Sequence, residues 1–343
     1  MTMLSCFKRR RLTAMAMTGA AFIMVAGLMI AAEVHAQETE QPEVVTLTYN
    51  WPTDLKGTVV VHLTKSQQSQ GQAVEETMTV EAKFWTLAND DGLTVFTENQ
   101  SFELSRSNQA EGVQALLQES LDEIAAISPN YKIDANGELL GVVGIDALHA
   151  TIMRWFDRLL ESVAELGTEL PEQNIAQIRQ LVERLSAPEV LQANIQAEWN
   201  RDVSQWQGAS LEKDAVYRLD ADVSTPMLGD APIPAVNEYV YHGRVACNDA
   251  DTALGCVKLT MTSRLHPEKA GDAIRQLLAP LGEAAPIIST LQIDTDVSLI
   301  TEPNTLIPHR MQQEKHVRLV ISKGEDGEEV TEQVENRTDI YRY

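Results

Sequence analysis

Apolar and polar residues alternate with a period of two over several long stretches of this chain. The alternation runs through residues 44–105, returns over residues 217–223 and 239–261, and occupies most of residues 291–343. Because successive side chains of a strand point to opposite faces, each stretch is expected to form strands with one buried face. Turn sequences such as Asn89-Asp90-Asp91-Gly92 separate the strands, and short turns of this kind join antiparallel neighbours.

Two local features refine this strand pattern. The apolar residues of the strand after Gly92 change parity between Val95 and Phe102, which predicts a β-bulge. Residues 131–143 surround Asn136-Gly137, so they are expected to form a short strand or hairpin.

A different spacing, with an apolar residue every three or four positions, predicts helices between the strand stretches. It occupies residues 113–124, 145–166, 175–185, 190–199 and 267–281. The stretch from Ile145 to Leu166 has the most continuous apolar stripe. Pro171 and Pro188 stand where first helical turns begin, a position that tolerates proline.

This order of elements indicates an α+β protein. We expect one or two curved antiparallel β-sheets packed against several helices, with a helical segment near residues 145–203. The expected organisation is one domain over residues 37–343. The alternative is two lobes, residues 44–143 and 215–343, bridged by the helices of residues 145–203.

The first 36 residues have the pattern of an export signal. Lys8 to Arg11 form a basic region, residues 12–32 are apolar, and Val34-His35-Ala36 fits a signal-peptidase site. We therefore expect cleavage after Ala36 and a periplasmic or secreted protein. Two alternatives remain: the apolar run is long enough to stay in the bilayer as an anchor, and Arg9-Arg10-Arg11 partly fits a twin-arginine signal.

The charge of the chain narrows the classes of partner. The formal net charge is −23, and binding to nucleic acids or to anionic membrane surfaces requires basic patches. Neither class of partner is expected. No second apolar run approaches the length of a membrane span, so no stable span is expected after cleavage of the signal.

Cys247 and Cys256 are the two cysteines that follow the signal, and strand-like residues lie on both sides of them. An even pair in an exported chain predicts a disulfide, which would close the mouth of a β-hairpin. The alternative of a redox or metal pair lacks support, because there is no Cys-x-x-Cys and no adjacent histidine cluster.

The sequence contains no recognisable catalytic motif. A phosphate-binding loop, a dinucleotide fingerprint and a Gly-x-Ser-x-Gly elbow are all missing, and no histidines have zinc-ligand spacing. The run from Asp134 to Glu138 is read as a hairpin turn because it is too short for a calcium loop. His62 and His242 are expected on the surface, and His149 as a cap or surface residue. No catalytic residue, cofactor or metal is therefore predicted.

Aromatic residues supply the candidate contact sites. Trp155 and Phe156 lie on the apolar stripe of residues 145–166, and for Trp155 and Trp199 packing in the core is the favoured interpretation. Trp206, in Gln205-Trp206-Gln207-Gly208 after a predicted helix end, is expected to be exposed. Trp155, Phe156 and Trp206 are thus the candidate residues for contact with a ligand or partner.

The order of elements over residues 44–343 resembles that of bacterial lipoprotein-carrier folds, in which a half-open antiparallel sheet covers helices and takes up acyl chains. It is similar also to many exported bacterial proteins without an assigned function. The resemblance implies that the helix with Trp155 and Phe156 lies in the concavity of the sheet. It favours a non-enzymatic periplasmic protein that binds a lipid, another apolar ligand or an envelope protein. The alternatives are an interaction module that uses the helices of residues 145–203, or a hydrolase without a recognisable motif.

Overall fold

The computed structural model describes most of the chain after the predicted signal. The described residues are 42–69, 72–107, 127–165, 172–223, 232–250, 252–278, 287–322 and 327–343. The predicted export signal and the helix predicted over residues 113–124 lie outside them.

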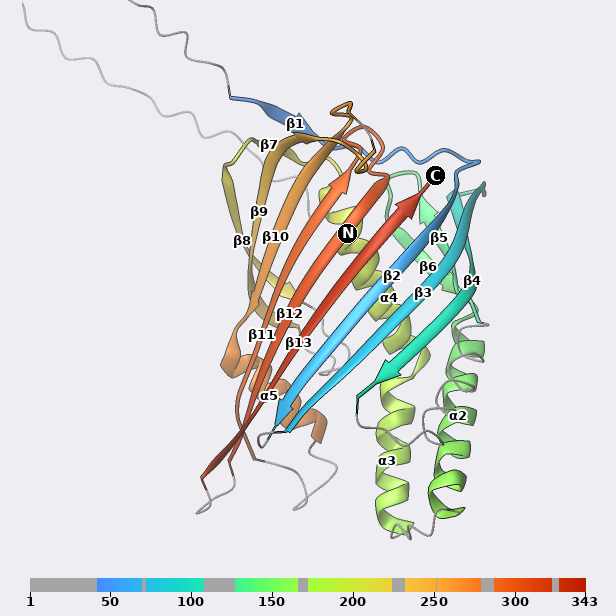
Figure 1. The fold of residues 1–343 in the computed structure, drawn as a ribbon, viewed down its shortest axis with the longest axis vertical. Coiled ribbons are helices and arrows are strands. Elements are labelled where there is room, and N and C mark those ends of the chain that lie inside the picture. The colour runs from blue at the N-terminus through green and yellow to red at the C-terminus, as the bar shows by residue number, and fades with distance from the viewer. Residues whose placement is uncertain are drawn as a thin grey trace, which may run out of the picture. The chain divides into compact units, whose positions relative to one another are not determined.

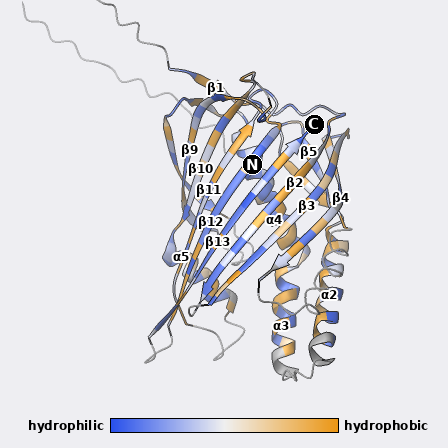
Figure 2. Ribbon diagram, viewed as in Figure 1, coloured by the Kyte–Doolittle hydropathy of each residue, from blue (hydrophilic) through white to orange (hydrophobic). Residues whose placement is uncertain are grey.

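An antiparallel sheet of 11 strands dominates the described part of the chain (Figure 1). Its strand order is β6-β5-β4-β3-β2-β13-β12-β11-β10-β9-β8. The strands are β2 (Lys56–Ser69), β3 (Gln72–Ala88), β4 (Gly92–Arg106), β5 (Asn130–Asp134), β6 (Leu139–Val143), β8 (Val216–Val223), β9 (Ile233–Val245), β10 (Cys256–Leu265), β11 (Ile287–Thr301), β12 (Pro308–Ser322) and β13 (Glu328–Arg342). The predicted antiparallel pairing is confirmed. Apolar and polar residues are interleaved along the strands in Figure 2.

The last strand, β13, pairs with β2 and so joins the two strand-rich stretches of the chain into one sheet. The register runs from Arg342 opposite Thr58 to Thr331 opposite Ser69. Every other neighbouring pair in the sheet is consecutive among the strands of that sheet. The sheet is therefore assembled from two meanders that meet at a single long-range pairing.

The predicted turn and bulge are both present between β3 and β4. The side-chain Oδ1 of Asn89 accepts hydrogen bonds from the backbone N–H groups of Asp91, at 2.9 Å, and Gly92, at 2.7 Å. The register then changes from Glu81 opposite Ser101 to Ala82 opposite Asn99, so one extra residue of β4 is inserted. This insertion is the physical reason for the change of parity in the sequence.

In the part of the chain that the structure describes, three consecutive helices and a fourth, separate helix accompany the sheet, as the periodicity predicts. They are α2 (Ile145–Glu165), α3 (Glu172–Leu185), α4 (Pro188–Asp202) and α5 (Pro267–Leu278). Helix α4 leads into a short 3₁₀ helix, η1 (Ser204–Trp206). Helix α2 packs on α3 and α4, whereas α5 packs on β9 and β11. None of the described helices is both long and apolar enough to cross a membrane.

The start of the described chain is held to the segment that follows α4. Strands β1 (Val44–Thr46) and β7 (Ser210–Glu212) form a second, two-stranded sheet, and the backbone N–H of Leu47 donates to the carbonyl of Ala209 at 2.9 Å. Leu47, Tyr49 and Trp51 are consequently buried. The alternation predicted for residues 45–49 is confirmed, although the strand itself ends at Thr46.

Within the described residues, two apolar cores lie on the sheet. The larger core combines residues from both ends of the chain, such as Leu47 and Phe84 with Leu259, Leu299 and Met311. The smaller core is built where α5 packs, and its buried members are Ile233, Ala235, Leu265, Ala270, Ala273 and Leu291. The larger core therefore draws on both strand-rich stretches, whereas the smaller core belongs to the second stretch alone.

Candidate functional site

A cavity of about 260 Å³ lies between α4 and the strands β2, β3, β4 and β13. The sheet contributes the aliphatic residues Val59, Val61, Val80, Ala82 and Val95, together with aromatic and polar residues. The helical side of the cavity is formed by Ile195, Trp199 and Val203. A concave site lined mainly by apolar side chains with a few polar groups is typical of sites for small ligands.

The strand register explains why aliphatic residues gather at this place. Val59 stands opposite Ala82 on β3 and Tyr341 on β13, and Val61 stands between Val80 and Asp339. Directly opposite residues of an antiparallel pair point to the same face. The alternation in β2, β3 and β13 therefore forms rows across the sheet, and α4 covers these rows.

Two indole rings are fixed at one wall of the cavity. Trp51 and Trp199 meet edge to face with ring centroids 5.3 Å apart. The Nε1–H of Trp51 donates to the carbonyl of Leu306 at 3.2 Å, and that of Trp199 donates to the carbonyl of Gly137 at 2.8 Å. Since each indole has a polar anchor and an aromatic neighbour, both rings are held in position.

The acceptor of the Trp199 bond comes from the hairpin between β5 and β6. Gly137 has a positive φ of +84°, and a Cβ at this position would lie 2.6 Å from the ring of Tyr49. Only glycine combines that backbone angle with so close an approach. The turn predicted from Asp134 to Glu138 is present, and Asp134 Oδ1 accepts from the backbone N–H of Asn136 and of Glu138, each at 2.8 Å.

A group of charged side chains adjoins the apolar rows. The guanidinium of Arg337 binds both carboxylate oxygens of Asp339 at 2.9 Å, and its Nη1 lies 3.2 Å from Glu198 on α4. Arg201 binds Asp202 through Nε at 2.7 Å and donates from Nη1 to Gln313 at 2.6 Å. The side chain of Asp339 is nearly inaccessible, at 1%, whereas that of Glu198 is 53% exposed.

The electrostatics of this group follow from burial and pairing. Burial by itself would lower the pKa of Arg337, but Glu198 and Asp339 outweigh it and raise that pKa well above the usual value. Burial raises the pKa of Asp339, and the charge of Arg337 opposes the change. Burial, together with the charge of Glu198, raises the pKa of Tyr131 to about 12. Both guanidinium groups are therefore charged and the Tyr131 phenol is neutral at physiological pH.

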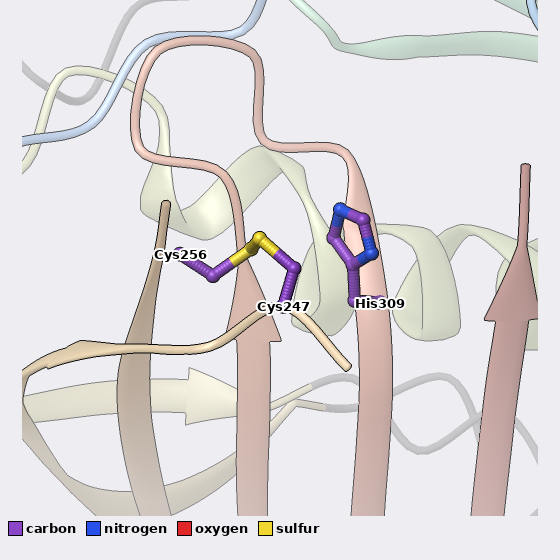
Figure 3. Close-up of side chains that lie close together, drawn as sticks. All are labelled: Cys247, Cys256 and His309. Atoms are coloured by element: carbon purple, nitrogen blue, oxygen red, sulfur yellow. A yellow bond between two sulfur atoms is a disulfide. The ribbon is translucent and has the colours of Figure 1, made fainter. Parts of the chain in front are cut away.

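The cysteines form a separate cluster (Figure 3). Cys247 and Cys256 form the predicted disulfide, and His309 lies beside them. Within the described residues, these three side chains are the group of potential metal donors whose ligand atoms lie within 4.8 Å of one another. The two sulfurs are bonded to each other, and Nε2 of His309 lies 3.2 Å from Glu302. Both sulfurs are therefore engaged in the disulfide at the mouth of the hairpin.

The prediction that Trp206 is exposed is wrong. Only 1% of its surface is accessible. Its Nε1–H donates to the carbonyl of Arg201 at 2.9 Å, and its ring meets that of Tyr239 edge to face at 5.4 Å. The 3₁₀ turn after α4 brings the indole onto β9, and nothing in the local sequence signals this packing.

Trp155 and Phe156 do not line the cavity. Phe156 is buried, and the guanidinium carbon of Arg179 on α3 lies 5.9 Å from its ring centroid, which is the geometry of a cation–π contact between helices. Trp155 is partly buried on the same helix. The helix at the cavity is α4 and not α2.

The histidine predictions have a mixed outcome. His62 and His242 are exposed, as predicted. His149 is part-buried, and its Nδ1 lies 2.7 Å from the carbonyl oxygen and 3.2 Å from the hydroxyl of Ser186. It therefore joins α2 to the turn between α3 and α4, and the prediction of a cap or surface role is wrong.

Several residues of the cavity are missed by sequence reasoning. The sequence predicts Trp199 as a core residue of its helix and marks Trp51 only as one of five tryptophans. It makes no prediction for Arg337, Asp339 and Tyr341. One signal was present: these last three residues alternate along β13, so a charged pair shares a face with an aromatic ring. The identity of their neighbours depends on the pairing of β13 with β2.

Comparison with known proteins assigns no family: neither the models of known protein families nor the curated proteins include a match to this chain.

Proposed function

We propose that this chain is an exported, non-enzymatic protein that binds an apolar ligand in the cavity between α4 and the sheet. The single observation that carries the proposal is the apolar lining of that cavity. Aliphatic side chains from three strands face Ile195 and Val203 of the helical side there. Burial of an apolar ligand gains roughly 25 cal/mol per Å² of apolar surface removed from water.

The size and position of the cavity support the binding of part of a hydrocarbon chain. A volume of about 260 Å³ lies just below the range of roughly 300–1,000 Å³ that ligand pockets occupy. We infer that the sheet curves around α4 and that ligand uptake widens this space. The proposal thus retains the resemblance to lipoprotein carriers, with α4 as the helix in the concavity.

Export is proposed on two grounds. The disulfide between Cys247 and Cys256 is of the kind that persists in oxidising compartments. The first 36 residues have the composition of a secretory signal. The proposed location is the periplasm or the medium, with cleavage after Ala36.

The test is native mass spectrometry with lipid extraction on the mature protein purified from the exporting cell. A bound apolar molecule, or saturable binding of the neutral fluorophore N-phenylnaphthylamine to the protein after extraction, is the expected result. A ligand-free protein that does not bind the fluorophore would contradict the proposal and direct attention to an envelope partner.

A pair of variants locates the binding. Val61→Phe adds bulk to a residue that lines the cavity, and Val60→Phe adds the same bulk to the opposite face of the same strand. We expect Val61→Phe to weaken fluorophore binding on the order of tenfold, because overfilling a packed site is unfavourable. Val60→Phe should bind as the wild type does. Equal affinities of the two variants would place the ligand elsewhere.

A further inference from the structure

The cavity combines aromatic walls with an excess of negative charge. Five aromatic residues line it: Trp51, Phe84, Tyr131, Trp199 and Tyr341. Three carboxylates, of Glu198, Asp202 and Asp339, lie on the same lining together with one guanidinium, that of Arg337. Aromatic faces and carboxylates both attract cations, and cages of this composition bind ammonium groups.

The two guanidinium groups of the cluster are occupied by protein acceptors. Arg337 binds Asp339 through Nε and Nη2, and its Nη1 lies 3.2 Å from Glu198. Arg201 binds Asp202 through Nε and Nη2, and its Nη1 donates to Gln313. An anionic head group would have to displace one of these bonds. Such bonds between charged groups are stronger than neutral ones, so the site disfavours an anion.

The carboxylates, in contrast, outnumber the cations. With Arg201 included, three carboxylates face two guanidinium groups, which leaves one negative charge without a full counterpart. Glu198 shares Arg337 with Asp339, and its side chain is 53% exposed. It is the most exposed of the three carboxylates, and therefore the one best able to turn towards a bound cation. The net charge of −23 of the whole chain would also attract cations to the molecule.

We propose that the ligand of this cavity is a small amphiphile whose apolar part lies on the aliphatic rows and whose ammonium group lies among the aromatic rings beside Glu198. This inference rests on the proposed function, because it names the class of ligand for the same cavity. Cationic amphiphiles are accordingly expected to bind more tightly than neutral or anionic amphiphiles with the same hydrocarbon chain.

The test compares three probes with the same hydrocarbon chain: decyltrimethylammonium, decanol and decanoate. Each probe is used to displace N-phenylnaphthylamine from the mature protein. The probe is kept below its own micellar concentration, and the pH is mildly alkaline. We expect decyltrimethylammonium to bind about tenfold more tightly than decanol, a difference of about 1.4 kcal/mol. Decanoate should bind more weakly than decanol.

A matched pair of variants separates the cavity from the surface charge. Glu198→Gln removes the exposed carboxylate of the cavity, and Glu332→Gln makes the same charge change on an exposed residue of β13 that pairs with Arg318 at 3.4 Å. Glu198→Gln should lower the affinity for decyltrimethylammonium by roughly three- to tenfold more than it lowers the affinity for decanol, and decanol binding that persists verifies that the variant is folded. Glu332→Gln should change neither affinity.

The outcomes distinguish the two proposals. The ammonium site is wrong, and the apolar binding function is retained, if decanol binds and decyltrimethylammonium binds no more tightly. The same conclusion follows if both variants lower the affinity for decyltrimethylammonium equally. If none of the three probes displaces the fluorophore, the apolar binding function fails and the ammonium site fails with it.

Discussion

At the scale of single residues, Asp339 and its neighbours explain how charges are accommodated beside an apolar cavity. A buried carboxylate loses its hydration, and several kcal/mol of this cost must be offset by pairing. For Asp339 this cost is offset by a bidentate contact with the guanidinium of Arg337, and the remaining Nη1 of Arg337 lies near Glu198. The arrangement is consequently sensitive to changes at either partner, since removal of one leaves an uncompensated buried charge.

The raised pKa of Asp339 leads to a pH-dependent prediction. Above its ordinary pKa of 3.8, the unfolded chain releases this proton while the folded chain retains it. The folded state then binds more protons than the unfolded state, so the contribution of Asp339 to stability falls as pH rises towards its raised pKa. In Asp339→Asn this titration is removed. The difference in unfolding free energy between the wild type and the variant should therefore shrink with rising pH in this window.

Urea unfolding of both proteins across the acid range measures that difference directly. If the unfolding free energies of the wild type and Asp339→Asn change in parallel with pH, burial does not perturb the pKa of this carboxyl group. A carbon-detected NMR titration of the Asp339 carboxyl gives an independent reading of the same pKa.

At the scale of elements, the hairpin of β9 and β10 is the part of the sheet that carries a covalent bond. Val245 pairs with Cys256 at the end of the ladder, and the disulfide joins two cysteines separated by nine positions. Cys256 is fully buried. Cross-linking lowers the entropy of the unfolded chain, so the bond stabilises the hairpin even though the loop it closes is short.

Removing this bond should have a moderate cost. The double variant Cys247→Ala/Cys256→Ala is expected to lose about 2.5–3 kcal/mol of unfolding free energy, the loop-closure entropy of so short a loop. Equilibrium unfolding in urea measures the loss. Reductant should destabilise the wild type by a similar amount and leave the double variant unchanged. A wild type insensitive to reductant would refute the assigned role of the bond.

At the scale of the described molecule, the pairing of β13 with β2 decides that two meanders become one sheet. Residues 42–343 behave as one compact unit by their internal contacts. The larger core also mixes both stretches, for example Phe84 with Leu299 and Met311. A protein built in this way cannot complete its larger core until β2 and β13 pair.

The prediction at this scale concerns fragments of the chain. Residues 37–214 and 215–343, expressed separately, should each fail to fold, because each would expose half of the larger core and one unpaired edge at β2 or β13. Mixed or co-expressed, they should associate and recover the far-ultraviolet circular dichroism of the intact protein. A dispersed NMR spectrum from either fragment alone would support two independent lobes instead.

The local structure of this protein follows from short stretches of its sequence. The period of two in residues 44–105, the turn at Asn89-Asp90-Asp91-Gly92, the bulge in β4, the helices of residues 145–202 and the disulfide were all predictable. Each depends on residues close together in the chain, where side-chain direction and turn geometry are set by neighbouring positions.

The position and the lining of the cavity depend on contacts between distant parts of the chain. Arg337 and Asp339 meet Val61 and Glu198 because β13 pairs with β2 and α4 crosses them, and no local pattern encodes either contact. The same reason explains the error at Trp206, which the turn after α4 places against Tyr239. Sequence periodicity specifies which face of an element is apolar. The element that packs on that face depends on the fold of the whole chain.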